Sequence, residues 1–418
     1  MKSASFYLVV VMAVSTSIGV FPAEAQFAFE KLEEYSGFEW EDPVQFFWNP
    51  RYNRVEGLFL NQGVKFYPEA IQNFELYGWL GGGFWNDSNK QFRYTAGFRK
   101  DFFDIERLSI GAEVFKKVES EDDWIVGEVE NSLAAFFFRE DYKDYYGTQG
   151  FKFFAEHLFK GIHTLRFEVG RRTFDAFERN IDWSVFGGDF DTNPKRADSF
   201  IAEGDEIGLK FITAFDWRDN PIFPLTGWYA EAIFEKTFED FDTDGLFVTV
   251  KRFQQTFGNQ RFFVRTMLGT RRGDIGTSMI GTPVDSLADQ YSIDLGGIGS
   301  LRGFDDKEFS GNRMFMLNFN YFFGGDILQK IPLDEVPGFS FFWPTLSLGV
   351  FLDTGWAWIT DPDDGLLDGF GELTFDNLET DIGLSFLVLE GVFRIDIAKR
   401  TDRSEDDFRV TFRLLENF

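Results

Sequence analysis

The chain has 418 residues, no cysteine and a formal net charge of −28 at pH 7. The lack of cysteine excludes a disulfide framework and a thiolate metal site, and the acidic balance excludes a nucleic-acid partner, because neutralising phosphates requires a basic face. Aromatic residues make up 19% of the sequence and include 57 phenylalanines, which is more than a soluble core needs and favours a surface that faces lipid.

Residues 1–25 have the features of a secretory signal. A short charged start at Lys2 is followed by an apolar run from Phe6 to Val14 and by small residues that end at Ala25, the order of regions found in signal peptides. No later stretch approaches the roughly 18 apolar residues of a membrane-spanning helix. We therefore predict that residues 1–25 are removed on export and that any membrane crossing by the mature chain uses strands.

Residues 26–53 are too few to bury a core of their own, and we predict a short periplasmic N-terminal segment here. Its aromatic residues Trp40, Phe46, Phe47 and Trp48 are expected to lie at the membrane interface or to plug the periplasmic mouth. The remaining residues, 54–418, are predicted to form the membrane domain.

Apolar and polar residues alternate in this domain. Phe92, Tyr94 and Phe98 share one face of an extended segment, whereas Arg93 and Arg99 share the other, and the two faces suit lipid and water. An arginine that faced lipid at the middle of the bilayer would cost roughly 2–4 kcal/mol, so the arginine face must be the lumen. A slip of one residue would reverse every side chain, which fixes the strand register.

Segments of this kind predict an all-β fold, a transmembrane antiparallel β-barrel of about sixteen strands. The strands are expected near Arg54, Gln72, Gln91, Ile105, Trp124, Gln149, His163, Glu203, Thr226, Asp244, Asn259, Gly311, Pro344, Leu378, Gly391 and Asp407. Acidic runs at residues 119–123, 361–364 and 405–407 are expected to be solvated loops and turns, with divalent-cation bridging to anionic lipid headgroups as the alternative.

Residues suited to catalysis are sparse. The two histidines, His157 and His163, have no serine nearby in the sequence, whereas a phospholipase site needs a nucleophile, a histidine and an orienting polar group together. The glycines in residues 78–83 lack the Lys-Ser/Thr of a phosphate-binding loop, and the acidic stretches 242–245 and 361–365 lack the downstream glutamate of a calcium loop. We predict no enzymatic activity, no cofactor and no metal site.

A glycine-rich stretch at residues 296–299 leads into Leu301, Arg302, Gly303 and Phe304. We predict that this longest outer loop folds back into the lumen. A buried unpaired guanidinium costs several kcal/mol, whereas a bidentate carboxylate pair roughly offsets its desolvation. Because alternation in residues 346–353 points Asp353 inward, Arg302 is predicted to pair with Asp353.

The end of the chain is a second distinctive feature. Phe412 and Leu414 alternate with Thr411 and Arg413, and the last residue is Phe418. A last strand with Phe412, Leu414 and a terminal aromatic resembles the signal by which outer-membrane barrels are recognised for assembly.

Four blocks together resemble the barrel of the outer-membrane assembly and surface-antigen superfamily that includes BamA and TamA. They are the turn with Asp216, Arg218, Pro224 and Gly227, the loop tip Leu301-Arg302-Gly303-Phe304, the strand opening Gly311-Asn312, and Phe351-Leu352-Asp353-Thr354-Gly355. Their order and spacing are similar to those of the family. The chain resembles a short bacterial surface antigen barrel without POTRA domains, because residues 26–53 leave no room for even one such module.

The resemblance also reveals a departure. In the family a second acid tends to lie on the strand before Asp353, whereas the matching inward position here holds Asn320. This difference either leaves Arg302 with one carboxylate or recruits Asp396, and the sequence leaves both alternatives open.

The function that the resemblance implies is assisting the insertion or translocation of protein or lipid into or across the bacterial outer membrane. The implied partners are outer-membrane lipid and either unfolded outer-membrane proteins or separate periplasmic proteins. Movement would use the seam between the first and last strands, where Gly57 and Gly63 weaken strand pairing. The alternative is a passive pore or structural barrel. Its lumen would favour anions, because it would be lined by Arg93, Arg99, Arg166, Arg172, Arg261 and Arg265.

Overall fold

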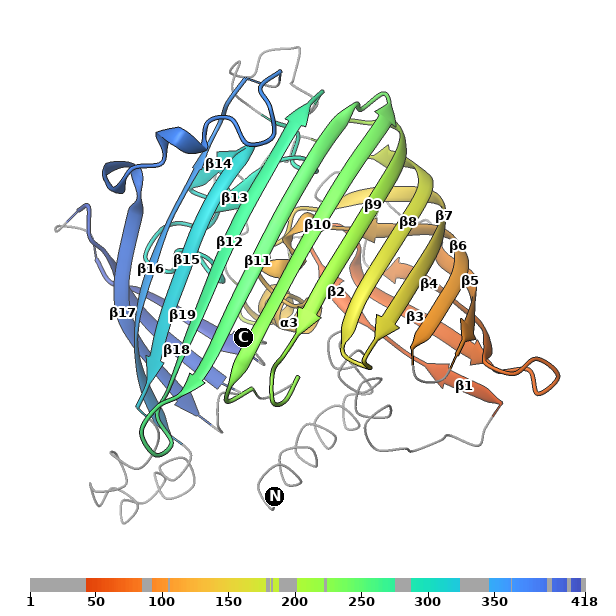
Figure 1. Ribbon diagram of the computed structural model, residues 1–418, viewed down its shortest axis with the longest axis horizontal. Coiled ribbons are helices and arrows are strands. Elements are labelled where there is room, and N and C mark those ends of the chain that lie inside the picture. The colour runs from red at the N-terminus through yellow and green to blue at the C-terminus, as the bar shows by residue number, and fades with distance from the viewer. Residues whose placement is uncertain are drawn as a thin grey trace.

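The computed structural model describes residues 43–84, 92–103, 106–177, 181, 183–187, 201–221, 224–274, 287–323, 346–361, 363–388, 393–403 and 407–414. Strands in these ranges form one large antiparallel sheet that curves around a central space, and a two-stranded sheet, β13 and β14 (Figure 1). Within these residues no helix combines the length and the apolar character needed to cross a membrane.

The strands of the large sheet are β1 (Val44–Phe47), β2 (Arg51–Asn53), β3 (Gly57–Phe66), β4 (Phe74–Phe84), β5 (Arg93–Phe102), β6 (Arg107–Glu119), β7 (Tyr146–Phe159), β8 (His163–Asp175), β9 (Gly204–Asp216), β10 (Gly227–Glu239), β11 (Thr243–Gln255), β12 (Arg261–Gly273), β15 (Arg313–Phe322), β16 (Ser347–Trp358), β17 (Glu379–Val388), β18 (Phe393–Arg400) and β19 (Arg409–Leu414). The smaller sheet pairs β13 (Ile293–Leu295) with β14 (Phe309–Gly311). Short 3-10 turns η5 (Phe370–Glu372) and η6 (Phe375–Asn377) follow β16.

β1 and β2 are two parts of one strand. They pair with β3 in a single register, from Val44 opposite Phe66 to Asn53 opposite Gly57. Pro50, which has no N–H to donate, lies at the interruption. When β1 and β2 are counted together, sixteen strands pair in chain order from the first to β19, and the predicted barrel of about sixteen strands is confirmed.

The count is correct although two strand positions differ from the prediction. The strand expected near Trp124 is wrong, because residues 121–124 form a 3-10 turn, η1 (Glu121–Trp124), and residues 128–138 form a helix, α3 (Glu128–Phe138). Two acidic residues in the first turn favour a helix N-terminus, and the central alanines are strong helix formers. Conversely, strand pairing begins at Val44, inside the segment 26–53 that we expected to precede the barrel.

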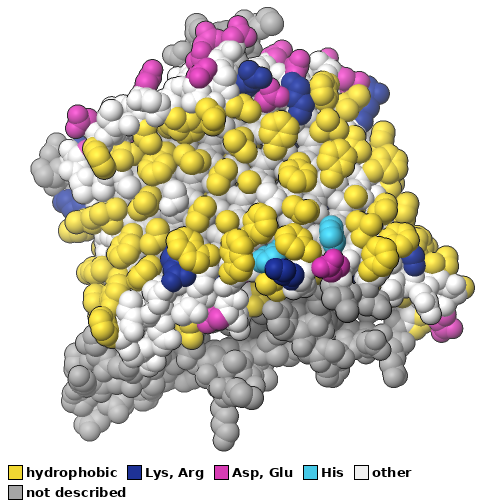
Figure 2. Space-filling view, viewed as in Figure 1, with side chains coloured by type: hydrophobic (Ala, Val, Ile, Leu, Met, Phe, Trp, Pro, Cys, Tyr) yellow, Lys and Arg dark blue, Asp and Glu magenta, His cyan; other side chains and the backbone are white. Residues whose placement is uncertain are grey.

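The two faces of the sheet differ as the alternation predicts. In β5 the side chains of Tyr94 and Phe98 are 37% and 38% exposed, whereas Arg93 is 3% exposed. Figure 2 shows the outward side chains as a broad apolar band, with acidic and basic side chains gathered along its upper margin. An outer surface of this kind matches the hydrocarbon layer of a bilayer.

Arg166 and Arg172, two of the inward-facing arginines, lie beside carboxylates of the barrel wall. Arg166 of β8 is 2.9 Å from Glu156 and 2.6 Å from Glu168, and Arg172 is 2.9 Å from Glu206. Each acid neutralises charge that an anion-attracting lumen would need to display.

Candidate functional site: a loop held inside the barrel

The loop between β12 and β15 turns back at three glycines. Gly296, Gly297 and Gly299 have φ angles of +117°, +79° and +79°, a region that residues with a Cβ rarely adopt. The Gly297 N–H donates to the carbonyl of Leu301 at 2.9 Å. An added Cβ on Gly299 would lie 2.3 Å from the carbonyl oxygen of Ile125, so this glycine also allows close contact with the segment that precedes α3.

Two apolar side chains anchor the loop tip. Leu301 and Phe304 are both 0% exposed, and they pack with Leu295, Met314 and Met316. Burial of a side chain of this size contributes about 1.5–3 kcal/mol. The tip is therefore a packed part of the barrel interior.

Arg302 lies between these anchors and reaches the barrel wall. Its Nε is 2.6 Å from Asp353 Oδ2 and its Nη2 is 2.8 Å from Asp353 Oδ1, which is a bidentate pair. Nη2 also donates to Asn320 at 3.0 Å, and the guanidinium lies 3.4 Å from the centre of the Phe351 ring. The structure thus brings Arg302 to Asp353 and Asn320 in a site where Asp353 is fully buried.

Asp396 contacts the same guanidinium. Its carboxylate is 3.4 Å from Arg302 Nη1, a longer contact than the pair with Asp353. Its closer partners are Arg394, at 2.8 Å, and the hydroxyl of Ser385. The departure at Asn320 therefore does not leave Arg302 with a single acid, because β18 supplies a second one.

Asp381 of β17 is a member of this site that the sequence analysis missed. It lies directly opposite Asp353 in the strand register, it is 0% exposed, and it accepts the backbone N–H of Gly303 at 3.0 Å. The same alternation that assigns Asp353 would have found it, because the neighbouring Ile382 and Leu384 face outward at 52% and 49% exposed.

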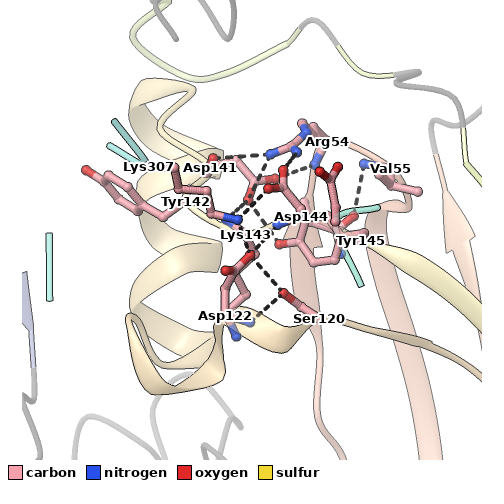
Figure 3. Close-up of polar contacts among 12 residues, drawn as sticks. Arg54, Val55, Ser120, Asp122, Asp141, Tyr142, Lys143, Asp144, Tyr145 and Lys307 are labelled. Carbon is pink, nitrogen blue, oxygen red and sulfur yellow. Dashed lines mark hydrogen bonds and ion pairs between the residues drawn. The ribbon is translucent and has the colours of Figure 1, made fainter. Parts of the chain in front are cut away.

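A second polar cluster joins the loop to the connection between β6 and β7 (Figure 3). Lys307 Nζ is 2.7 Å from Asp122 and also contacts Asp144. Arg54, in the turn between β2 and β3, is 2.7 Å from Asp144 and 3.7 Å from Asp141. All five residues are buried, so the cluster ties three distant parts of the chain together.

Burial beside this acidic cluster raises the pKa of Asp289 in the loop. Burial, together with the negative charge of Asp144, raises the pKa of Asp289 to about 8, although the charge of Lys307 acts in the opposite direction. Burial also raises the pKa of Asp294. The loop therefore carries one carboxyl group, that of Asp289, whose charge changes close to neutral pH.

The family block with Asp216 and Gly227 forms the turn between β9 and β10, at the opposite end of the strands from the loop. Asp216 accepts two hydrogen bonds from the Arg218 guanidinium, at 2.9 and 2.7 Å. Gly227 has φ +125°, and an added Cβ would lie 2.3 Å from the carbonyl oxygen of Trp217. Pro224 is buried in the same turn, so all four predicted turn residues belong to one compact hairpin.

The predicted C-terminal signal is only partly described. Phe412, in β19, is 68% exposed on the outward face, and Leu414 shares that face. Phe418 lies outside the described residues.

His163 contacts the backbone and aromatic rings of the barrel wall. His163 Nδ1 accepts the backbone N–H of Asp216 at 3.1 Å, and its ring packs against Phe159, Phe215 and Trp217. Within the ranges that the structure describes, no group of three or more histidine, aspartate or glutamate side chains is arranged to hold a metal ion.

The fold is similar to that of a solved BamA structure from Haemophilus ducreyi that lacks POTRA domains 1–3. The match has a TM-score of 0.54 and 13% sequence identity, and it covers 89% of this chain and 70% of that chain. This chain therefore has the β-barrel fold of BamA. No family model and no curated protein sequence matches it.

Two CdiB structures also match. Those from Acinetobacter baumannii and Escherichia coli have TM-scores of 0.38 and 0.41 and identities of 11% and 12%. The matches cover 89% and 90% of this chain, and 59% and 62% of the two CdiB chains.

Proposed function

We propose that this protein is an integral outer-membrane barrel of the BamA/TamA type that assists the insertion or translocation of protein or lipid. The fold shared with the BamA barrel, the apolar outer surface and the four sequence blocks support this proposal. Its partners on this view are outer-membrane lipid and either unfolded outer-membrane proteins or separate periplasmic proteins.

The observation that carries the proposal is the burial of Arg302 against the inner wall. Arg302 and Gly303 together contact Asn320, Asp353, Asp381 and Asp396, which belong to the four consecutive strands β15 to β18. A buried guanidinium is tolerated only where such partners compensate its desolvation. The loop therefore holds together the part of the wall that leads to the last strand.

The first strands are held by different residues. Arg54, which links β2 to β3, pairs with Asp141 and Asp144 of the β6–β7 connection. The two sides of the seam are thus supported by separate clusters, and Lys307 links the clusters through Asp144. On this proposal, separation of the two sides of the seam requires the link between Lys307 and Asp144 to break.

The proposal is tested with purified full-length protein in liposomes. We expect wild-type protein to accelerate the folding of an unfolded outer-membrane barrel protein into the liposomes, and Arg302→Ala to reduce that acceleration at least tenfold. Arg403→Ala, at an arginine that is 58% exposed, is the matched control and should retain it. Equal folding rates in liposomes with and without the wild-type protein would contradict a role in protein insertion, and a parallel assay of lipid movement between leaflets tests the lipid alternative.

A passive pore remains the competing function because the lumen is polar. The buried loop and the paired wall charges oppose it, since both reduce the open, positively charged path that anion flow requires. Steady anion-selective conductance of the wild-type protein in planar bilayers, without any effect on protein or lipid insertion, would favour the pore.

A further inference from the structure

The seam of the barrel lies between the edge of its first strand, β1 and β2, and the edge of its last strand, β19. Paired registers run without interruption from β3 through every intervening strand to β19. On one side of the seam β19 pairs with β18, and on the other side β1 and β2 pair with β3. Unpaired edges expose backbone N–H and C=O groups that need other partners.

Helix α3 supplies such a partner to the last strand. Glu130 accepts the backbone N–H of Leu414 at 2.8 Å and forms a bidentate contact with the Arg413 guanidinium at 3.0 and 3.2 Å. Arg413 also donates to the carbonyl of Ile125, just before the helix, at 3.2 Å. Glu130 and Arg413 are each 9% exposed, so these charge-assisted bonds lie in surroundings where they are strong.

The same helix supplies a partner to the first strand. Ser132 Oγ accepts the backbone N–H of Tyr52 at 3.1 Å. The Tyr52 ring packs edge-on against Phe136 with ring centres 5.3 Å apart, and Ala135 is fully buried in the same apolar cluster. Two residues of one helical turn, Glu130 and Ser132, therefore satisfy N–H groups on both sides of the seam.

The helix is also connected to the loop inside the barrel. Ile125 and Val126, which lead into α3, pack against Ile298 of the loop. Lys307 pairs with Asp122, in the turn before the helix. The position of α3 is therefore coupled to the position of the loop tip.

From these contacts we propose that α3 is an internal latch that holds the first and last strands of the barrel together at the seam. While α3 is in this position, Ser132 and Glu130 accept hydrogen bonds from the backbone N–H groups of Tyr52 and Leu414. When α3 withdraws, both edges become open to an added strand or to lipid. This inference concerns the barrel wall and does not depend on whether the protein handles clients, so a failed insertion assay leaves it intact.

The direct test measures hydrogen exchange of full-length protein in lipid nanodiscs. Glu130→Gln keeps an acceptor oxygen but loses the ionic pair with Arg413, and we expect amide exchange in residues 409–414 to accelerate roughly tenfold to a hundredfold, the range expected when a hydrogen bond to a charged group is lost. Glu128→Gln is the matched control, because it removes the same charge from the same turn while its nearest cation is Lys143 at 3.7 Å. Equal exchange in the two variants would overturn the proposal.

A reversible cross-link gives a second test within one folded protein. The chain has no cysteine, so Glu130→Cys with Arg413→Cys can be bridged by a bifunctional thiol reagent that spans the two shortened side chains and is released by a reductant. We expect the bridged form to match the wild type in amide exchange and conductance, and the released form to show faster exchange in residues 409–414 and in residues 51–53, with larger conductance. A released form that behaves like the bridged form would show that α3 does not close the seam, and Glu130→Gln decides the question if the double variant does not fold.

Discussion

Asp353 and Asp381 lie directly opposite one another on β16 and β17, and both are fully buried, yet the loop contacts them in different ways. The guanidinium of Arg302 pairs with Asp353, whereas Asp381 accepts the backbone N–H of Gly303. Asp353 thus holds the Arg302 side chain and, at 3.4 Å, its backbone N–H, whereas Asp381 holds the backbone of the next residue. Together they determine both the position and the direction of the tip.

Arg302→Ala should lower the free energy of unfolding by about 3–5 kcal/mol, because it leaves Asp353 buried without its main cation. Arg302→Lys should cost less, since a lysine retains the charge but loses the bidentate geometry. Chemical denaturation in detergent measures both effects. Arg403→Ala should change stability by less than about 0.5 kcal/mol, and a similar loss in that control would contradict a specific role for Arg302.

Asp381→Asn should be tolerated, whereas Asp353→Asn should be strongly destabilising. Asp353 and Asp396 form ion pairs with Arg302 and Arg394, whereas Asp381 contacts the loop tip through the Gly303 N–H. An asparagine at 381 therefore leaves those ion pairs in place, and its amide oxygen can still accept the Gly303 N–H. Thermal unfolding of the two variants, side by side, checks the order. A larger loss at Asp381 than at Asp353 would show that the charge balance has been assigned incorrectly.

Gly303→Ala should displace the loop tip by steric conflict. The added Cβ would lie 2.6 Å from the Asp381 Cβ and 3.0 Å from the Arg400 backbone nitrogen, and overpacking of this kind costs about 1–3 kcal/mol. Gly82→Ala is the matched control, because its Cβ would meet nothing closer than Phe92 at 4.0 Å. Limited proteolysis of the loop should be faster in Gly303→Ala alone, and equal cleavage of both variants would contradict the close fit.

Stability should fall as pH rises through the range in which Asp289 titrates. The unfolded chain loses this proton near pH 4, whereas the folded protein retains it up to the raised pKa of about 8. The folded state therefore binds the proton more tightly, and the stability associated with Asp289 is complete below pH 4 and is lost progressively toward pH 8. The charged groups that set this balance are Asp122, Asp144, Asp294 and Lys307.

Melting temperatures at pH 5 and pH 9 test this dependence. Wild-type protein should melt at a lower temperature at pH 9, and Asp289→Asn should reduce the difference because it removes the titrating group. An unchanged difference in the variant would assign the pH dependence to other carboxyl groups.

Much of the barrel could be predicted because side-chain direction in a strand repeats every two residues. That local rule, combined with the cost of placing arginine in lipid, assigned Arg93 to the lumen and Tyr94 to the outer face. The same rule placed Asp353 inward, and the need of a buried guanidinium for a carboxylate selected Arg302 as its partner. The same rule failed near Trp124, where residues 128–138 form a helix.

By itself, the sequence determined the strand period, the direction of the wall side chains and the pairing of one loop arginine with one wall acid, because each of these follows from neighbours along a strand or from the energy of a single charge. Only the tertiary structure decided how the ends of the sheet meet. Glu130 and Arg413 are 283 residues apart, and neither the helix nor the last strand carries a local signal for the other. Their contact depends on closure of the whole barrel, which brings the two edges and the inserted helix to one place.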